Sequence, residues 1–157
     1  MNATLDYLKM VVKVRNSAPP PSLKYSCIEE FVLKNGKAYD EVRAFPRDLK
    51  KGKMRECFRN AALLSMEKGW VYVEGYATSI IPTLHAWCAD DEGKVVDPTW
   101  NDGQDYFGVS FSGEYLRKTL IRKKTFGLLD NLEMGFPLLT GEHPFPEEEE
   151  QRDERER

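Results

Sequence analysis

The chain is poor in cysteine and histidine, with 3 cysteines and 2 histidines among its 157 residues. Cys27, Cys57 and Cys88 stand far apart and form no Cys-x-x-Cys pair. An odd number of widely separated cysteines argues against a disulfide framework and favours a reducing compartment. We therefore expect a cytoplasmic protein.

Long apolar runs are also missing. No stretch is long enough to span a bilayer. Near the N-terminus, Asp6, Lys9 and Lys13 interrupt the apolar residues, and no small-residue cleavage site follows, so this segment does not resemble a signal peptide. The sequence predicts no membrane partner.

The charge balance does not favour a nucleic-acid partner, because the formal net charge is −3. A predicted helix after Ser112 carries several basic residues but no interleaved aromatic side chains on which bases could stack. We expect its basic side chains to be exposed to solvent: Arg117, Lys118, Arg122, Lys123 and Lys124. The composition, with 41% hydrophobic and 31% charged residues, is typical of a globular domain.

Apolar periodicity predicts an α+β fold. Helices are expected over residues 2–15, from about Tyr25 to Asn35, over 54–68 and after Ser112, with the first ended by prolines 19–21. Strands are expected over residues 38–45, 70–77, 83–89, 94–97 and 106–111. Segment 126–139 is apolar but interrupted by Gly and Pro, so we expect it to be irregular. We predict one domain over residues 1–146 and a charged, solvated or disordered tail over 147–157.

The stretch from Cys57 to Trp100 holds the candidate chemistry. Cys57 opens a predicted helix, His85 lies on a predicted strand, and Asp97 ends the next strand. A thiol nucleophile needs a base beside it and a carboxylate that orients the base. A helix N-terminus lowers the pKa of a thiol, which favours Cys57 as the nucleophile. The spacings fit a helix packed on a small antiparallel sheet.

Other interpretations of these residues remain. Cys57 and His85 are also compatible with core packing, and Asp97 before Pro98 is typical of a turn. A metal site could use Cys57, His85, Cys88 and Asp97 as ligands. However, residues 85 and 88 on a strand point to opposite faces, which disfavours one shared ion. His143 lies beside a proline in a predicted loop, and we leave it out of the site.

Four short motifs resemble the core of the transglutaminase-like superfamily, which belongs to the wider papain-like group of thiol enzymes. They are Cys57-Phe-Arg-Asn-Ala61, Tyr72-Val-Glu-Gly-Tyr76, His85-Ala-Trp87 and Val96-Asp-Pro-Thr99, in that order. The resemblance covers residues 54 to 111. Without the calcium loop, β-sandwich domains and pro-segment of larger family members, it implies a small, stand-alone protein of bacterial or phage type. It implies a papain/transglutaminase-like core in which a helix carrying the nucleophile packs on a small antiparallel sheet, with extra helices at both ends.

The resemblance also implies roles for individual residues. Cys57 would be the nucleophile, His85 the general base and acid, and Asp97 the orienting carboxylate, with the Cys57 backbone N–H in the oxyanion hole. Trp87 and Trp100 would wall the substrate cleft, although core packing explains them equally well. No metal or cofactor is implied, and the Arg-Gly-Gly that precedes the cysteine in arylamine acetyltransferases is absent: Lys53 to Glu56 stand there instead.

The expected function is therefore that of a cysteine hydrolase or acyltransferase: a peptidase, amidase or deamidase acting on an amide, peptide or thioester bond. Its substrate would be a protein or small-molecule amide, with no nucleic acid involved and no oligomeric state specified. Water and an amine both remain open as the group that resolves the acyl-enzyme. The alternative is an inactive module of the same fold that binds a protein or small-molecule partner.

Overall fold

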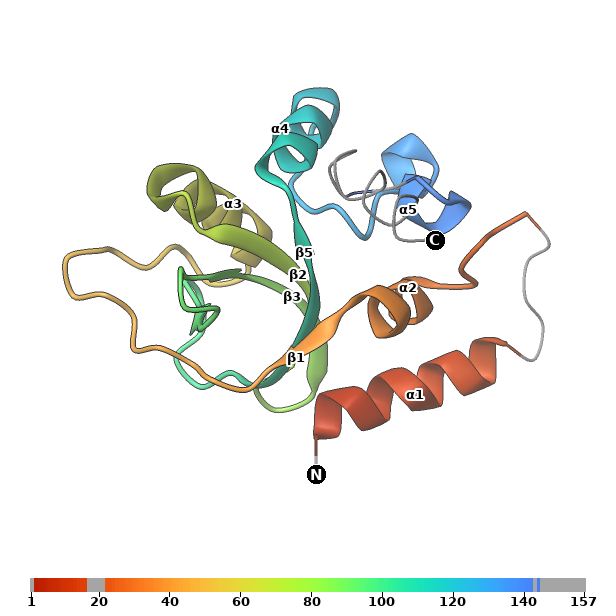
Figure 1. The fold of residues 1–157 in the computed structure, drawn as a ribbon, viewed down its shortest axis with the longest axis horizontal. Helices are drawn as coiled ribbons and strands as arrows, with labels where there is room; N and C mark the ends of the chain where they lie inside the picture. The colour runs from red at the N-terminus through yellow and green to blue at the C-terminus, as the bar shows by residue number, and fades with distance from the viewer. Residues whose placement is uncertain (1, 17–21, 143, 145–157) are drawn as a thin grey trace, which may run out of the picture.

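A computed structural model describes residues 2–16, 22–142 and 144 of the chain. Five α-helices, one short 3-10 helix and five strands lie in this part of the chain (Figure 1). The helices are α1 (Ala3–Arg15), α2 (Ile28–Asn35), α3 (Cys57–Lys68), α4 (Gly113–Arg122), η1 (Leu132–Met134) and α5 (Pro137–Thr140). The strands are β1 (Lys37–Tyr39), β2 (Val71–Thr78), β3 (Pro82–Ala89), β4 (Val95–Val96) and β5 (Gln104–Phe111).

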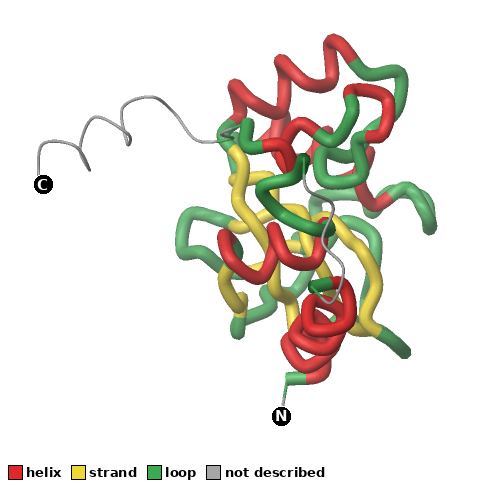
Figure 2. The backbone as a smooth tube through the Cα atoms, turned by 90° about the vertical axis from the view of Figure 1, so that its right-hand side faces the viewer, coloured by secondary structure: helices red, strands yellow, loops and turns green. Residues whose placement is uncertain are grey.

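The strands form one curled, half-barrel sheet in the order β1-β5-β2-β3-β4, and every neighbouring pair is antiparallel. The long strands β5, β2 and β3 occupy the centre, while the short strands β1 and β4 form the two edges. Figure 2 shows the same strands from the side, with α1 nearly end-on beneath them. The fold is therefore of the predicted α+β class, and its sheet has five strands.

The two faces of this sheet carry different side chains, because alternate residues of a strand point to opposite faces. On the face that we call the helix face, the sheet packs against the helices and the C-terminal segment. Its buried side chains on β2 and β3 include Tyr72, Tyr76, Ala86 and Cys88. The opposite face, which we call the aromatic face, gathers a second cluster of Tyr39, Val73, Ala77, Trp87, Ala89, Val95 and Tyr106.

Helix α3 brings Cys57 to the helix face. Its buried side includes Ala61, Ala62 and Leu64, whose small and branched side chains allow close packing on the sheet. The Cys88 thiol on β3 donates to the Ala61 carbonyl, with 3.2 Å between the two atoms. The helix ends at Gly69, which has the left-handed backbone (φ 68°) that glycine adopts most readily.

The segment between β1 and α3 crosses the molecule on the side away from α1, α2 and α5 (Figure 1). It follows the edge strand β4, because the backbone N–H of Val95 donates to Glu41 and that of Arg43 donates to Val95. Further along, the Gly52 N–H donates to the Pro98 carbonyl. This segment is thereby held against the loop that follows Asp97.

Three expectations from the sequence need correction. The strand expected over residues 38–45 ends at Tyr39, and only an isolated bridge at Val42 follows, because the segment turns away to β4. The irregular segment 126–139 includes η1 and the start of α5. Lys123 is 8% exposed instead of solvated, because its ammonium group donates to backbone carbonyls of the following segment.

The three expectations about prolines 19–21, His143 and the tail 147–157 lie outside the described residues. Within the described ranges, none of the helices has the length and apolar character needed to cross a membrane.

Candidate functional site

His85 and Asp97 form a buried pair on the aromatic face. The Nε2 atom of His85 and the Oδ2 atom of Asp97 are 2.8 Å apart, and the two residues are 0% and 4% exposed. They meet because β3 carries His85 on this face, while the chain leaves β4 immediately before Asp97. The predicted link between imidazole and carboxylate is present.

Asp97 accepts three further hydrogen bonds. Its Oδ1 accepts from the backbone N–H groups of Thr99 and Trp100, both at 2.9 Å, and its Oδ2 accepts from the Tyr106 hydroxyl at 2.7 Å. Burial alone raises the pKa of this carboxyl, but the hydrogen bond and charge of His85 and the other donors outweigh burial and lower it. Because the ionised carboxylate accepts only, Nε2 of His85 is the donor in their pair.

The remaining ring nitrogen of His85, Nδ1, is buried and has no hydrogen-bond partner among the described residues. With Nε2 carrying the proton, Nδ1 of a neutral imidazole is an acceptor. The half-buried Trp100 covers the ring: the two ring centroids are 3.7 Å apart, with 11° between the planes. The imidazole is therefore oriented by Asp97 and held by Trp100, and its Nδ1 atom is left without a hydrogen-bond partner among the described residues.

Trp87, the second predicted cleft residue, is fully buried two residues further along β3. It lies 6.2 Å from the His85 ring and 4.9 Å from the Tyr106 ring, measured between centroids. A Cβ atom at Gly108 would come within 2.8 Å of the Trp87 ring, so glycine at this position makes room for the indole. Trp87 therefore supports the residues around His85 from within the aromatic face.

Cys57 is the first residue of α3 and is 9% exposed. Burial raises the pKa of its thiol to about 11, while interactions with the backbone of Ala86 and Phe58 act in the opposite direction, and the negative charges of Glu74 and Asp97 add to the rise. The sequence predicts a lowered pKa from the helix N-terminus; in this arrangement, burial outweighs that effect. The thiol is held in its neutral form.

The structure brings two of the three predicted residues together, while Cys57 lies on the other face of the sheet. His85 and Asp97 are directly bonded, and Cys57 interacts with the backbone of Ala86, the residue next to His85. Within the described part of the chain, no hydrogen bond joins the thiol to His85 Nδ1. Because the imidazole points to the aromatic face, a proton transfer between them requires a rearrangement that brings the thiol to that nitrogen.

The structure adds three residues that the sequence motifs did not single out, and two of them, Asn60 and Tyr106, hold the loop around Asp97. Asn60, one turn after Cys57, donates from Nδ2 to the Lys53 carbonyl and to Thr99 Oγ1, both at 2.9 Å. It therefore ties α3 to the loop after Asp97. Tyr106, which donates to Asp97, gave no signal beyond its place in a predicted strand.

Glu74 is the third unexpected residue, and it lies on the helix face of β2, opposite Ala86. It is 0% exposed and accepts hydrogen bonds from the Tyr72 hydroxyl (2.6 Å) and from the backbone N–H groups of Leu128 and Leu129 (2.8 Å each). A glutamate between Val73 and Gly75 in an otherwise apolar strand was the sequence signal for it. Its carboxylate fastens the C-terminal segment to the sheet.

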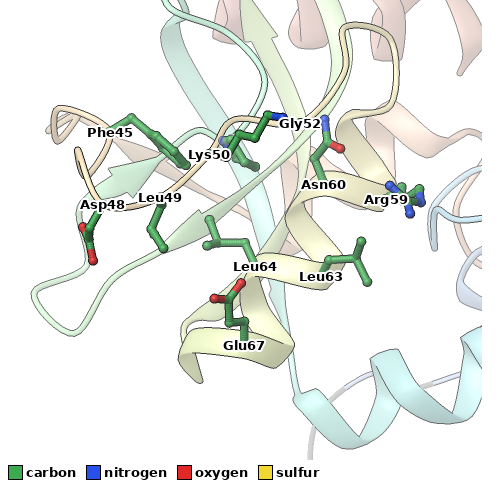
Figure 3. Close-up of a pocket in the computed structure, with 11 residues that line it drawn as sticks. Phe45, Asp48, Leu49, Lys50, Gly52, Arg59, Asn60, Leu63, Leu64 and Glu67 are labelled. Carbon is green, nitrogen blue, oxygen red and sulfur yellow. The ribbon is translucent and has the colours of Figure 1, made fainter.

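Two cavities flank the segment before α3, and Phe45 lines both. One, of about 370 Å³, lies between that segment and the outer side of α3, where side chains from both elements face the same hollow (Figure 3). The other, of about 420 Å³, adjoins Asp97 and Trp100. Cys57 lines neither cavity.

Within the residues that the structure describes, no three His, Cys, Asp or Glu side chains are grouped so that they could hold a metal ion. His85 points to the aromatic face and Cys88 to the helix face, as the spacing on a strand predicts.

Comparison of the chain with protein-family models, with curated proteins and with solved structures finds no match.

Proposed function

We propose that this protein is a cysteine hydrolase or acyltransferase of transglutaminase-like type, acting on an amide, peptide or thioester bond. The observation that carries the proposal is the buried His85–Asp97 pair, in which Nδ1 of His85 has no hydrogen-bond partner among the described residues. The Cys57 thiol interacts with the backbone of Ala86, the residue next to His85. A carboxylate, an oriented imidazole and a thiol at a helix start are the components of thiol acyl transfer.

In the proposed reaction, the Cys57 thiol transfers its proton to Nδ1 of His85 as its sulfur attacks the substrate carbonyl carbon. The backbone N–H of Cys57 stabilises the resulting oxyanion. The C–N or C–S bond then breaks, and the leaving amine or thiol takes the proton from His85. Water or an amine next gives its proton to His85, attacks the acyl-cysteine and releases the product, and the proton returns to the sulfur.

Asp97 has a positioning role in this scheme. Its four hydrogen bonds fix the carboxylate, and the carboxylate fixes the proton on Nε2, so that Nδ1 is left as the base. When His85 becomes doubly protonated, the adjacent negative charge stabilises the imidazolium.

A second candidate is a module of this fold that binds a partner without catalysis. Two observations favour it: His85 is 0% exposed beneath Trp100, and burial raises the pKa of the Cys57 thiol to about 11. A protein in this state binds its partner without forming a thiolate.

The pH dependence of Cys57 alkylation by iodoacetamide, located by mass spectrometry, distinguishes the two candidates. An enzyme in which the thiol reaches His85 reacts with a midpoint below the value of about 8.5 for a free thiol, and His85→Ala raises that midpoint. A midpoint near 11 in both proteins contradicts the enzyme and supports the binding module. The buried thiols of Cys27 and Cys88 are internal controls, and circular dichroism checks that the variant is folded.

A further inference from the structure

The cavity of about 420 Å³ beside Asp97 has the size of a small-molecule site, for which about 300–1,000 Å³ is typical. One wall comes from the segment before α3, and the other comes from the loop after Asp97 and the start of β5. The aromatic residues Phe45, Trp100 and Tyr106 line it, together with Val42 and Ala44. Most of the exposed lining is polar, and the partly exposed rings of Phe45 and Trp100 are its aromatic part.

Asp97 is the one carboxylate among the residues that line the cavity. Its two oxygens already accept from His85, Tyr106 and two backbone N–H groups. The next acidic groups in the chain are engaged elsewhere: Asp102 accepts from Ser79, and Asp105 accepts from the Ala3 backbone. A negatively charged ligand in the cavity thus meets no unpaired carboxylate in its lining.

Two cationic side chains line the same cavity, and they differ in whether a carboxylate already pairs with the charge. Arg43 points its guanidinium to Asp90, at 3.3 Å, and lies over the Trp70 ring. Lys51 has no carboxylate partner among the described residues. It donates to the Trp100 carbonyl at 2.7 Å, and its Nζ lies 5.3 Å from the centre of the Phe45 ring.

The ammonium group of Lys51 is therefore held in place, and it can still donate hydrogen bonds to a ligand. An ammonium group has three N–H donors, and among the described residues Lys51 uses one of them, for the Trp100 carbonyl. Because the Trp100 carbonyl and the Phe45 ring already hold the side chain, little further ordering is needed when an anion binds. Two aromatic residues that fix Lys51 also line the cavity, so cation and apolar surface are adjacent.

We propose that this cavity binds a small organic carboxylate with a planar apolar body. The carboxylate accepts from Lys51, and the apolar body packs against the partly exposed rings of Phe45 and Trp100. This site is separate from the proposed nucleophile, since Cys57 does not line the cavity. It adjoins the Trp100 side chain that covers His85.

The test is a titration with benzoate, followed by the backbone amide resonances of the lining residues Ala44 and Gly103 in a two-dimensional NMR spectrum. Benzoate is expected to shift these resonances in a saturable way, and Lys51→Gln is expected to weaken binding by at least about 10-fold, because a charge-assisted hydrogen bond is lost. Benzamide, the neutral analogue, should bind more weakly than benzoate.

Lys50→Gln is the matched control. Lys50 is the neighbouring lysine, but it lines the other cavity (Figure 3), so this variant should bind benzoate like the unmodified protein. Equal weakening in both variants, equal binding of benzamide and benzoate, or no saturable shift up to about 10 mM benzoate would overturn the proposal. The spectra also show whether each variant is folded.

The same titration on Cys57→Ala separates this proposal from the proposed function. Binding in this variant supports the carboxylate site whether or not the thiol is catalytic. Loss of benzoate binding in a folded Cys57→Ala protein counts against a separate site.

Discussion

Glu74 and Asp97 are both buried carboxylates, but they lie on opposite faces of the sheet and differ in their partners. Glu74 accepts from a tyrosine hydroxyl and two backbone N–H groups. Asp97 has a comparable set of donors and, in addition, the imidazole of His85 at 2.8 Å. Burial raises the pKa of Glu74, and the neutral donors and the charge of Lys123 do not reverse that rise, whereas the pKa of Asp97 is lowered.

This difference shows what each face contributes. On the helix face, a carboxylate surrounded mainly by neutral donors serves to fasten the segment around Leu128 to the sheet. On the aromatic face, the carboxylate has a partner that can itself become charged, and this is the requirement for moving a proton. Burial and donor count are similar at the two sites, so the directly bonded imidazole distinguishes them.

Breaking the pair on the aromatic face should have the largest effect. Asp97→Ala leaves buried donors on His85, Tyr106 and the loop backbone without their acceptor, and because each unpaired buried group costs about 1–3 kcal/mol, we expect a total of at least about 3 kcal/mol. We expect the free energy of unfolding, measured with urea, to fall by about that amount. A loss under 1 kcal/mol would contradict the central role of Asp97 in this face.

The corresponding change on the helix face should have a smaller effect. Glu74→Gln keeps the shape and one acceptor oxygen but leaves at least one donor unpaired, which costs about 1–3 kcal/mol. Hydrogen exchange of the Leu128 and Leu129 amides should become faster, because these groups lose their acceptor. If these amides stay protected, Glu74 is not what fastens the segment.

A helix cap distant from both carboxylates should matter less. The Ser112 side chain accepts from the Tyr115 N–H at the start of α4. Ser112→Ala is expected to cost about 1 kcal/mol in urea unfolding. The pH profile of Cys57 alkylation should not change, which makes this variant a control for general loss of stability.

The smallest expected effect is a difference between the two sites in how the free energy of unfolding changes with pH. The lowered pKa of Asp97 contributes stability above the unfolded value of about 3.9, and that contribution is lost as the pH falls through the folded pKa. The raised pKa of Glu74 has the opposite sign: stability falls as the pH rises from about 4.3, the unfolded value, to the folded value.

Urea midpoints measured at several pH values on Asp97→Asn and Glu74→Gln check these signs. Relative to the unmodified protein, Asp97→Asn should lose the decrease in stability that occurs as the pH falls. Glu74→Gln should lose the decrease in stability that occurs as the pH rises. Slopes of the same sign at both sites would show that the two carboxylates do not differ as described.

Much of the fold could be predicted from periodicity. The helix expected over residues 54–68 is Cys57–Lys68, and the strand expected over 83–89 is Pro82–Ala89. Where the prediction from sequence failed, a tertiary contact was the reason. Lys123 looks like another solvated lysine of a basic helix, but carbonyls at residues 127 and 130 capture its ammonium group. No local pattern encodes that contact.

The candidate site was predictable to a similar extent. The register of β3 and β4 places His85 and Asp97 on one face, and their spacing was enough to expect the pair. Tyr106 and Asn60 were missed because each acts across the fold, on Asp97 and on Thr99. The role of Cys57 as a nucleophile stays a prediction, since its protonation depends on burial and on a rearrangement that brings the thiol to His85.

The shape of the sheet's edges has a consequence for contacts between molecules. The edge strands β1 and β4 have only 3 and 2 residues. The segment between β1 and α3 also lies along β4 and hydrogen-bonds to the backbone of Val95. A second chain adds to a sheet by pairing with unoccupied backbone groups of an edge strand, and short edges offer few of them. The central strand β2 pairs with β3 on one side and with β5 on the other. The fold therefore keeps the backbone of this strand away from intermolecular strand pairing.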